Sequence, residues 1–463
     1  MRNKVFIIEY YTASPHFETS IEISIQAKKK GDDVIYNFLN IPFLILRIPK
    51  HLNLNFFKNY FYVLKESKQK IEILKKLFLF KIELKILSKI NNPHIYLKCL
   101  HYSIFHPLDF NRLKKYEYDS INLGVGAVST YVSLLGNDNP IITWRLVKLK
   151  KILFEAAYAF ELTKKIISDQ NPNLVITFNG RNNIDNAILK ACKIHNIPVK
   201  VHERGATYEK YELFEPPLHS YTNVYKRMID YWNESNLSEN KKKEIATDFF
   251  TKIRNGVSIG WESFSSHFDD ELNFNINNKK VITYFVGSDD ELVCVELDEI
   301  DKQPLFETQK EAVRFLMDLI SIKNDTELII RVHPNISNKS KEQKEYWNNL
   351  KGKNVTLIKS DSKVNSYLLI EKSFCILTYG STVGIEASFW NKPSILLGLS
   401  YYRSLNCTYS PSNLIELTDL LNSDNLLPFD NSNSYIYGYY FNSFGKNYEY
   451  YSPKNLFEGE LLI

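Results

Sequence analysis

Small polar residues and a carboxylate follow a short apolar run near residue 380. Residues 374–377 have the composition of a buried strand, and Gly380, Ser381 and Thr382 form a small-residue turn after it. The residues that follow have the apolar spacing of a helix, whose free N–H groups and dipole favour an anion such as phosphate. Glu386, one turn into that helix, can accept hydrogen bonds from ribose hydroxyls. An N-capped helix after a core strand would produce the same pattern without any ligand.

Two further apolar runs end in residues that can bind an anion. One ends in Arg331-Val332-His333-Pro334, where Pro334 biases His333 towards an extended backbone. The other covers residues 281–286, and Gly287-Ser288-Asp289-Asp290-Glu291 follows it. Ligands bind at the carboxyl ends of strands in a doubly wound parallel sheet. We therefore predict that the three strand ends are neighbours and together form a ligand-binding crevice.

The first half of the chain predicts two more β-α-β units. Strands are expected at 5–9, 34–38, 174–178 and 197–202, with helices at 18–30 and 184–195 between them. The last two strands are followed by Asn179-Gly180-Arg181 and Glu203-Arg204-Gly205, which should be neighbours across the sheet.

A carboxylate at a strand end, such as Glu203, can take a proton from a hydroxyl group. It can equally well form an ion pair with Arg204 or Arg181, and Arg181 is the expected anion contact of the two loops. His195 and His202 are interpreted as packing or surface residues.

The length of 463 residues is too great for one core. We expect an α/β protein of two Rossmann-like domains, at residues 1–265 and 266–463. The formal net charge of +5 and the pI near 8.6 favour anionic partners without singling out nucleic acid, and none is expected. Five scattered cysteines without a CxxC pair argue against a disulfide framework or zinc site. The first apolar run is too short for a signal peptide, and a cytoplasmic location is expected.

Residues 54–90 interleave lysines with aromatic and aliphatic residues. Such a helical stretch could contact the cytoplasmic face of the inner membrane, or it could be a surface helix pair with solvated lysines. Residues 122–130 contain Gly124-Val125-Gly126, either a loop facing a cleft or a site of close helix packing. Residues 208–217 are expected to form a loop.

The motifs from residue 287 onward resemble those of capsule polysaccharide biosynthesis proteins, which include β-Kdo transferases. The matching motifs are Gly287-Ser288-Asp289-Asp290-Glu291, Arg331-Val332-His333-Pro334, Val364-Asn365-Ser366-Tyr367 and Tyr379-Gly380-Ser381-Thr382-Val383-Gly384-Ile385-Glu386-Ala387. They are more distantly similar to sialyl- and polysialyltransferases that use CMP-sugars. The resemblance covers about the last 180 residues and a patch near residue 200. It implies a GT-B fold, with two Rossmann-like domains facing a cleft.

In such relatives a His-Pro pair and a Ser/Thr loop hold the nucleotide phosphate. The resemblance thus implies that His333 is catalytic and that the donor contacts Gly287, Ser288, Arg331, Gly380, Ser381, Thr382 and Glu386. Related transferases carry an acidic-acidic-Gly motif where this chain has Glu203-Arg204-Gly205, which implies that Glu203 acts on the acceptor. Asn179, Arg181 and Arg204 are the expected acceptor or anion contacts.

The expected function is transfer of a sugar, with a Kdo-like acidic sugar favoured, to a capsule or lipopolysaccharide glycan or glycolipid. The donor is expected to be a nucleotide sugar, CMP-linked in preference to UDP- or GDP-linked. No metal or other cofactor is expected, because His, Arg and a helix N-terminus can stabilise a leaving phosphate. One alternative is a CDP-glycerol or CDP-ribitol phosphotransferase of the teichoic-acid type, which shares the Arg-x-His-Pro strand end. The other is a non-catalytic scaffold in a capsule-assembly complex.

Overall fold

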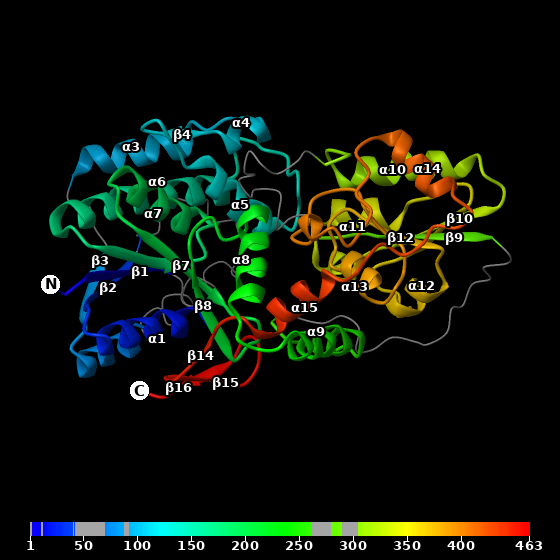
Figure 1. Ribbon diagram of the computed structural model, residues 1–463. Helices are drawn as coiled ribbons and strands as arrows, with labels where there is room; N and C mark the ends of the chain where they lie inside the picture. The colour runs from blue at the N-terminus through cyan, green and yellow to red at the C-terminus, as the bar shows by residue number, and fades with distance from the viewer. Residues whose placement is uncertain are drawn as a thin grey trace.

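The protein is a mixed α/β structure with two large, mainly parallel sheets (Figure 1). The computed structural model describes residues 2–10, 13–39, 41, 70–87, 92–260, 279–288 and 304–463. The sheets form because apolar strand sequences are covered by helices on both faces, as parallel sheets require. In β1, for example, Phe6, Ile7 and Ile8 are completely buried.

The first part of the chain contains β1 (Lys4–Glu9), α1 (His16–Lys29), β2 (Asp33–Leu39), η1 (Lys76–Phe80), β3 (Glu83–Leu87), α3 (Pro93–Ile104), α4 (Phe110–Lys114), β4 (Glu117–Tyr118), β5 (Ile121–Asn122), α5 (Gly124–Leu135), α6 (Val147–Gln170), β6 (Leu174–Phe178), α7 (Asn183–Ile194), β7 (Val199–Arg204), β8 (Lys210–Phe214), α8 (Tyr221–Glu234) and α9 (Glu239–Arg254). The second part contains β9 (Lys280–Phe285), α10 (Gln309–Ser321), β10 (Thr326–Arg331), η3 (Pro334–Asn338), α11 (Lys341–Asn348), β11 (Val355–Ile358), α12 (Ser366–Lys372), β12 (Cys375–Thr378), α13 (Val383–Phe389), β13 (Ser394–Leu396), η4 (Arg403–Leu405), α14 (Leu414–Asn422), α15 (Ser434–Ser443), β14 (Lys446–Asn447), β15 (Tyr451–Pro453) and β16 (Gly459–Leu461).

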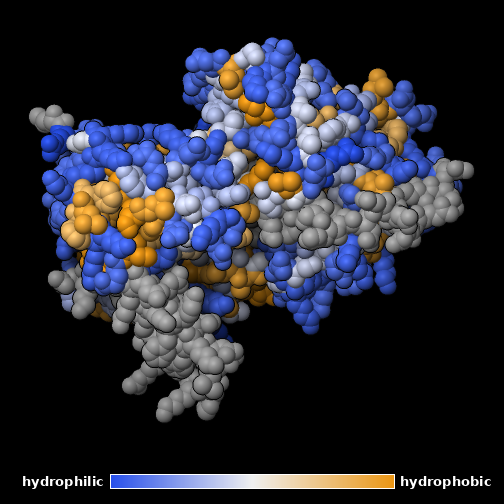
Figure 2. All heavy atoms as spheres, turned by 90° about the horizontal axis from the view of Figure 1, so that it is seen from below, coloured by the Kyte–Doolittle hydropathy of each residue, from blue (hydrophilic) through white to orange (hydrophobic). Residues whose placement is uncertain are grey.

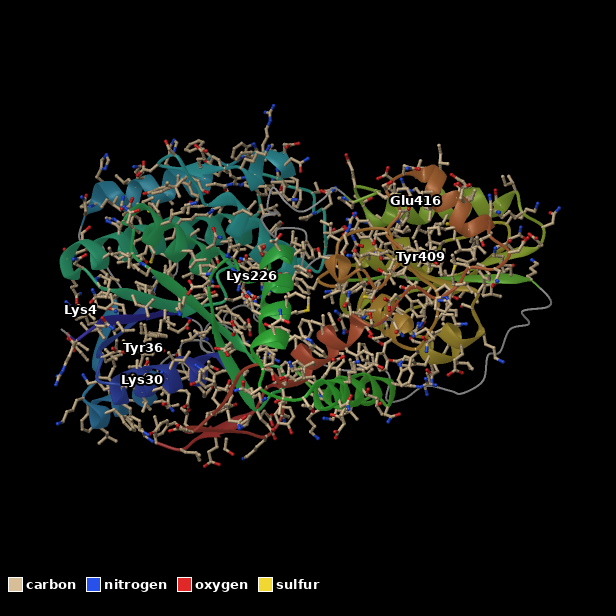
Figure 3. All side chains as sticks on the ribbon, in the orientation of Figure 1. Lys4, Lys30, Tyr36, Lys226, Tyr409 and Glu416 are labelled. Atoms are coloured by element: carbon tan, nitrogen blue, oxygen red, sulfur yellow. The ribbon has the colours of Figure 1, made fainter. Side chains whose placement is uncertain are left out.

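The first sheet has seven strands in the order β14-β8-β7-β6-β1-β2-β3. The five strands from β7 to β3 are parallel, and β8 and β14 are added antiparallel at one edge. Helices α3, α5, α6 and α7 cover one face, and α1 with η1 covers the other. Tyr36 of β2, labelled in Figure 3, is fully buried and lies 2.6 Å from the Ser20 hydroxyl of α1. The β-α-β units predicted at 5–38 and 174–202 are confirmed.

The second sheet is wholly parallel, with the order β11-β10-β9-β12-β13. Strand order reverses at β9, because β10 and β11 lie on one side of it and β12 and β13 on the other. Such a reversal places the loops after the central strands at a crevice where ligands bind in open α/β sheets.

The end of the chain returns to the first sheet. Helix α15 packs against α8 and α9 near the middle of the molecule, and β14 then pairs with β8 (Figure 1). Apolar residues of α8 and α9, such as Met228 and Phe250, share a core with β9, β12 and α13. Helices α8 and α9, which lie within the expected range 1–265, thus pack with elements of the second sheet, and the expected domains at 1–265 and 266–463 stay a prediction. The expected boundary itself lies outside the described residues.

Several local predictions need correction. Residues 83–87, expected within a helical stretch, form β3, because β2 pairs with them in parallel register. The predicted loop at 208–217 contains β8, which pairs with β7. Of the two alternatives for Gly124 and Gly126, the structure shows helix packing, because both residues lie in the first turn of α5. A Cβ at Gly126 would lie 2.7 Å from the Asn186 Cβ, so the glycine allows close packing on α7.

Part of the predicted basic-aromatic stretch can be compared with the surface. Residues 54–69 and 88–90 of it lie outside the described residues, whereas η1 exposes Phe78 and Leu79 by 69% and 61%. Figure 2 shows a largely hydrophilic face interrupted by apolar patches, one of them at the end of the molecule where η1 and α1 lie. Membrane contact of this stretch stays a prediction. Within the described ranges, no helix has the length and apolar character needed to cross a bilayer.

Candidate functional site

Three strand ends lie side by side at the carboxyl edge of the second sheet. Phe285, the last residue of β9, is in register with Arg331 of β10 on one side and with Thr378 of β12 on the other. The loops that carry Gly287, His333 and Gly380 therefore leave the same edge. This confirms the prediction that the three strand ends are neighbours.

The turn between β12 and α13 is held by a buried carboxylate. Glu386 accepts hydrogen bonds from the Thr382 hydroxyl at 2.9 Å and from the Tyr367 hydroxyl at 2.5 Å. Burial raises the pKa of Glu386. The Ser381 hydroxyl accepts from the Val383 amide at 3.4 Å. One Glu386 oxygen thus binds the turn and the other binds α12, and the predicted contact with a donor ribose stays a prediction.

Gly380 is required by a close approach of two chain segments. A Cβ at this position would lie 2.5 Å from the Leu399 carbonyl oxygen, which follows β13. The Ser381 carbonyl accepts from the Tyr402 hydroxyl at 2.7 Å. The backbone of the turn is therefore fixed from the side of β13.

Arg331 is almost completely buried, with 1% of its surface exposed. Its guanidinium donates to the carbonyls of Lys359 at 2.6 Å, Ser362 at 3.0 Å and Val332 at 3.1 Å. Burial lowers its pKa to about 10. These contacts hold the turn between β11 and α12, a role that the sequence reading did not foresee. Its predicted contact with a donor stays a prediction.

His333 and Gly287 flank the same edge. The His333 Nδ1 accepts from the Asn335 amide at 3.1 Å and caps η3. In a neutral imidazole the proton then lies on Nε2, which suits donation to a phosphate oxygen. The Gly287 amide donates to Gln309 Oε1 at 2.6 Å, and Gln309 Nε2 donates back to the Gly287 carbonyl at 3.3 Å. Gln309 was not predicted. Ser288 directly follows Gly287 in the chain.

A second polar cluster lies at the carboxyl edge of the first sheet, around Glu203. Its Oε2 accepts from Asn179 Nδ2 at 2.6 Å, and its Oε1 accepts from the Arg204 amide at 3.0 Å. His16 Nδ1 lies 3.3 Å from Oε1. The structure thus confirms that the loops after β6 and β7 are neighbours.

The charge state of Glu203 follows from these contacts. Burial opposes ionisation, but the interactions with His16, the Arg204 amide and Asn179 outweigh it and lower the Glu203 pKa. The pKa of His16 is lowered by burial, although Glu203 acts to raise it. At neutral pH a carboxylate therefore lies beside a neutral imidazole.

The two predicted arginines of this edge have different neighbours. The Arg181 amide donates to Asn179 Oδ1 at 3.3 Å, and its charge helps to lower the pKa of His219. The Arg204 guanidinium carbon lies 5.5 Å from the ring centre of Phe457, in the C-terminal segment. Their predicted contact with an acceptor is not tested by these contacts and stays a prediction.

His219 and Tyr401 connect the two sheets at this point. Tyr401, which follows β13, places its hydroxyl 3.4 Å from His219 Nδ1, just before α8. Burial first, and then Arg181 and Arg227, lower the pKa of His219 to about 4, while Glu203 acts to raise it. The cluster around Glu203 is therefore linked to the second half of the molecule through a neutral histidine.

Replacement of His219 by glutamine is expected to reduce the loss of stability in mild acid. The folded pKa of about 4 lies below the ordinary 6.5, so the unfolded chain binds the proton first. Stability is therefore fully present above pH 6.5 and is lost as the pH falls towards 4, by up to about 3 kcal/mol. Urea unfolding between pH 7 and 4.5 measures this. Parallel losses in the wild type and His219→Gln would contradict the assignment.

Glu9 and His202 form a further pair in this cluster, with Glu9 Oε2 2.9 Å from His202 Nε2. Both side chains are completely buried. The interpretation of His202 as a packing residue agrees with this burial. Sequence reasoning missed Glu9, His16 and His219, although Glu9 directly follows the first apolar run and His16 lies in the segment after it.

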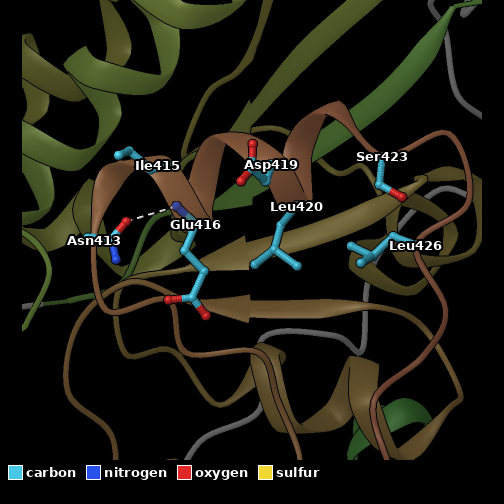
Figure 4. Close-up of a pocket in the computed structure, with 7 residues that line it drawn as sticks. All are labelled: Asn413, Ile415, Glu416, Asp419, Leu420, Ser423 and Leu426. Atoms are coloured by element: carbon cyan, nitrogen blue, oxygen red, sulfur yellow. Dashed lines mark hydrogen bonds between the residues drawn. The ribbon is translucent and has the colours of Figure 1, made fainter.

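A metal site is not evident in the part of the chain that the structure describes, where no three His, Cys, Asp or Glu side chains converge. Residues 269–271 and 289–291 lie outside that part. An open surface depression lies on α14, where the Asn413 side chain accepts from the Glu416 amide at 2.9 Å (Figure 4). It contains none of the predicted site residues.

Residues 223–414 match the model of a family described as capsule polysaccharide biosynthesis protein. The matched segment runs from α8 to the start of α14 and so includes all three strand ends of the second sheet. It does not include the cluster around Glu203. No curated protein matches the chain.

Solved structures with low similarity include the KpsC β-Kdo 2,4 transferase of Thermosulfurimonas dismutans. The match has 13% sequence identity and a TM-score of 0.40, and it covers 59% of this chain and 80% of that one. The β-Kdo 2,7 transferase of the same KpsC has 11% identity, covers 60% of this chain and 80% of its own, and has a TM-score of 0.33. S. aureus MnaA with UDP has 14% identity over 95% of this chain and 92% of its own, with a TM-score of 0.28. At these TM-scores the likeness carries neither the fold nor the function.

Proposed function

We propose that the protein is a glycosyltransferase that moves a sugar from a nucleotide donor to a capsule or lipopolysaccharide glycan. One observation carries the proposal. The segment that matches the capsule polysaccharide biosynthesis family is the one in which His333, the 380–382 turn and Gly287 leave the same sheet edge.

The donor would bind at this edge, and the acceptor would approach the Glu203 cluster of the first sheet, in a GT-B arrangement. The contact between His219 and Tyr401 supports it, because the charge of Glu203 acts on His219 and Tyr401 belongs to the loop after β13. A CMP-linked, Kdo-like acidic sugar is favoured by the motif resemblance. A cytoplasmic location, with contact between the basic-aromatic stretch and the inner membrane, is part of the same proposal.

Two groups of residues would divide the chemistry. Glu203 would take the proton of the acceptor hydroxyl, since its lowered pKa keeps it ionised at neutral pH. His333 and the hydroxyls of Ser381 and Thr382 would stabilise the negative charge that grows on the leaving phosphate. Fixed donors serve this purpose well, because they need no reorganisation during the reaction.

The proposal predicts that CMP raises the melting temperature of the protein. A ligand that binds only the folded state stabilises it by about 2.7 kcal/mol at a hundredfold excess over its Kd. We would measure thermal shifts with CMP, CDP, UDP, GDP and NAD, for the wild type, His333→Ala and the exposed-site control His94→Ala. CMP should stabilise the wild type and His94→Ala, and His333→Ala much less.

Each other outcome of this panel has a distinct meaning. Stabilisation by CDP alone would favour a CDP-alditol phosphotransferase, which the mass of the product would identify. Stabilisation by UDP or GDP would change the donor class. No shift with any nucleotide would contradict the proposed donor site and favour a non-catalytic scaffold.

A further inference from the structure

The tertiary structure places a histidine directly behind the candidate base. His16 begins α1, after β1, whereas Glu203 lies in β7. Strand β6 lies between these two strands, and its last residue, Phe178, packs on the His16 ring with centroids 4.3 Å apart. The imidazole is therefore positioned by three segments that are far apart in the sequence.

The geometry distinguishes the two members of this pair. His16 Nδ1 lies 3.3 Å from Glu203 Oε1, and the side chains are 9% and 22% exposed, respectively. Asn179 Nδ2 and the Arg204 amide fix the carboxylate from other directions. The carboxylate is thus the member more open to an incoming hydroxyl group, and the imidazole lies behind it.

Several charged groups act on the pair. His16 is influenced by Glu203, Arg204 and His202 of β7 and by Glu9 of β1. His16 and His219, which precedes α8, help to lower the pKa of Glu203. Glu203 in turn helps to raise the pKa of Tyr448 in the C-terminal segment. At neutral pH the pair is a carboxylate beside a neutral imidazole.

We propose that His16 is a positioning residue that acts through Glu203: it orients the carboxylate and shares the proton that Glu203 takes from the acceptor. This inference rests on the proposed transferase function. In the reaction, the acceptor O–H bond breaks and its oxygen bonds to the sugar carbon. The bond from that carbon to the donor phosphate breaks, and the phosphate leaves with the electron pair. The proton passes to Glu203 and from there to His16, which leaves an imidazolium beside the Glu203 carboxylate.

A neighbouring pair shows what a purely structural arrangement looks like here. Glu9 Oε2 and His202 Nε2 are 2.9 Å apart, both side chains are fully buried, and the centres of the His202 and Phe178 rings are 5.6 Å apart. The residue types are the same, and both pairs lie at the same sheet edge. Of these two pairs, the His16–Glu203 pair has the partly exposed carboxylate and can meet an acceptor.

The coupling of the two groups can be measured without any substrate. Histidine-labelled protein would be titrated by NMR, and the His16 signal would be assigned by its loss in His16→Gln. Because a nearby carboxylate favours the charged imidazolium, the His16 pKa should fall by about one pH unit in Glu203→Gln. An equal His16 pKa in the wild type and in Glu203→Gln would overturn the coupling of His16 to Glu203.

The role in proton transfer needs a pH profile. CMP release from CMP-Kdo would be followed with water or a Kdo-terminated glycan as acceptor, for the wild type, His16→Gln and the exposed-site control His94→Gln. We expect His16→Gln to lower kcat by about tenfold or more. The acid limb of kcat/KM should move to lower pH, because the first proton then binds Glu203 instead of His16. Nucleotide thermal shifts should not change.

The outcomes separate the two proposals. A slower His16→Gln with an unmoved acid limb would overturn proton sharing and leave His16 as a packing residue. Turnover and pH profile equal to those of the wild type would overturn any role of His16. Absence of turnover with every donor would overturn the transferase itself, and an NMR coupling would then report a structural contact only.

Discussion

Replacement of Glu203 by glutamine is expected to lower sugar transfer by about 10²- to 10⁴-fold, the usual contribution of a general base. Glutamine has nearly the same shape but cannot accept the proton of the acceptor hydroxyl. The lowered pKa of Glu203 keeps the carboxylate ionised at neutral pH. The proposed donor site belongs to the other sheet, so CMP should still raise the melting temperature of Glu203→Gln.

The matched control for this variant is Glu212→Gln. Glu212 lies opposite Glu203 in the β7–β8 pairing, and it also accepts from the amide of the following residue, here at 2.8 Å. Transfer rates are measured with the donor that the thermal shifts identify. Equal losses in both variants would show an effect on the strand pair. A fully active Glu203→Gln would remove Glu203 from the mechanism.

Replacement of Arg331 by methionine is expected to lower the free energy of unfolding by about 3 kcal/mol. The guanidinium donates to three backbone carbonyls, two of them in the turn after β11. Methionine fills much of the space but leaves these acceptors without their donor in a buried position. A buried polar group that loses its partner costs about 1–3 kcal/mol. Urea unfolding of both proteins measures the difference.

Arg314→Met is the control for this experiment, because Arg314 is an exposed residue of α10. It should change stability by less than about 0.5 kcal/mol. If Arg331→Met kept the stability of the wild type and lost nucleotide binding, the structural role would be wrong and Arg331 would belong to the donor contacts. If Arg331→Met lost both stability and nucleotide binding, we would attribute the loss of binding to the lost hydrogen bonds, because the turn that they hold lies beside β10.

Local sequence patterns were sufficient for much of the second sheet. The apolar runs before Gly287, His333 and Gly380 predicted three strands, and the topology rule for parallel sheets predicted that their ends would be neighbours. The register of β9, β10 and β12 agrees. These predictions succeeded because buried parallel strands have continuous apolar sequences, which are visible without tertiary information.

The edge strand β3, and β8 next to the opposite edge, could not be recognised in the same way. β3 carries Glu83 and Lys85 among its apolar residues, and β8 lies in a sequence rich in Tyr and Glu. Both strands are only partly buried, so their sequences resemble a loop or an amphipathic helix until a neighbouring strand pairs with them. The helical expectation for residues 83–87 was wrong for this reason.

By itself, the sequence determined the α/β class, the three neighbouring strand ends of the second sheet and the placement of Glu203 near the end of a strand, which is β7. Only the tertiary structure decided what these residues contact. In that structure Arg331 donates to backbone carbonyls, and the two Glu386 oxygens accept from Thr382 and Tyr367. His16 lies beside Glu203. The physical reason is that strand formation depends on local apolar pattern, whereas the partners of a buried polar group come from segments distant in the chain.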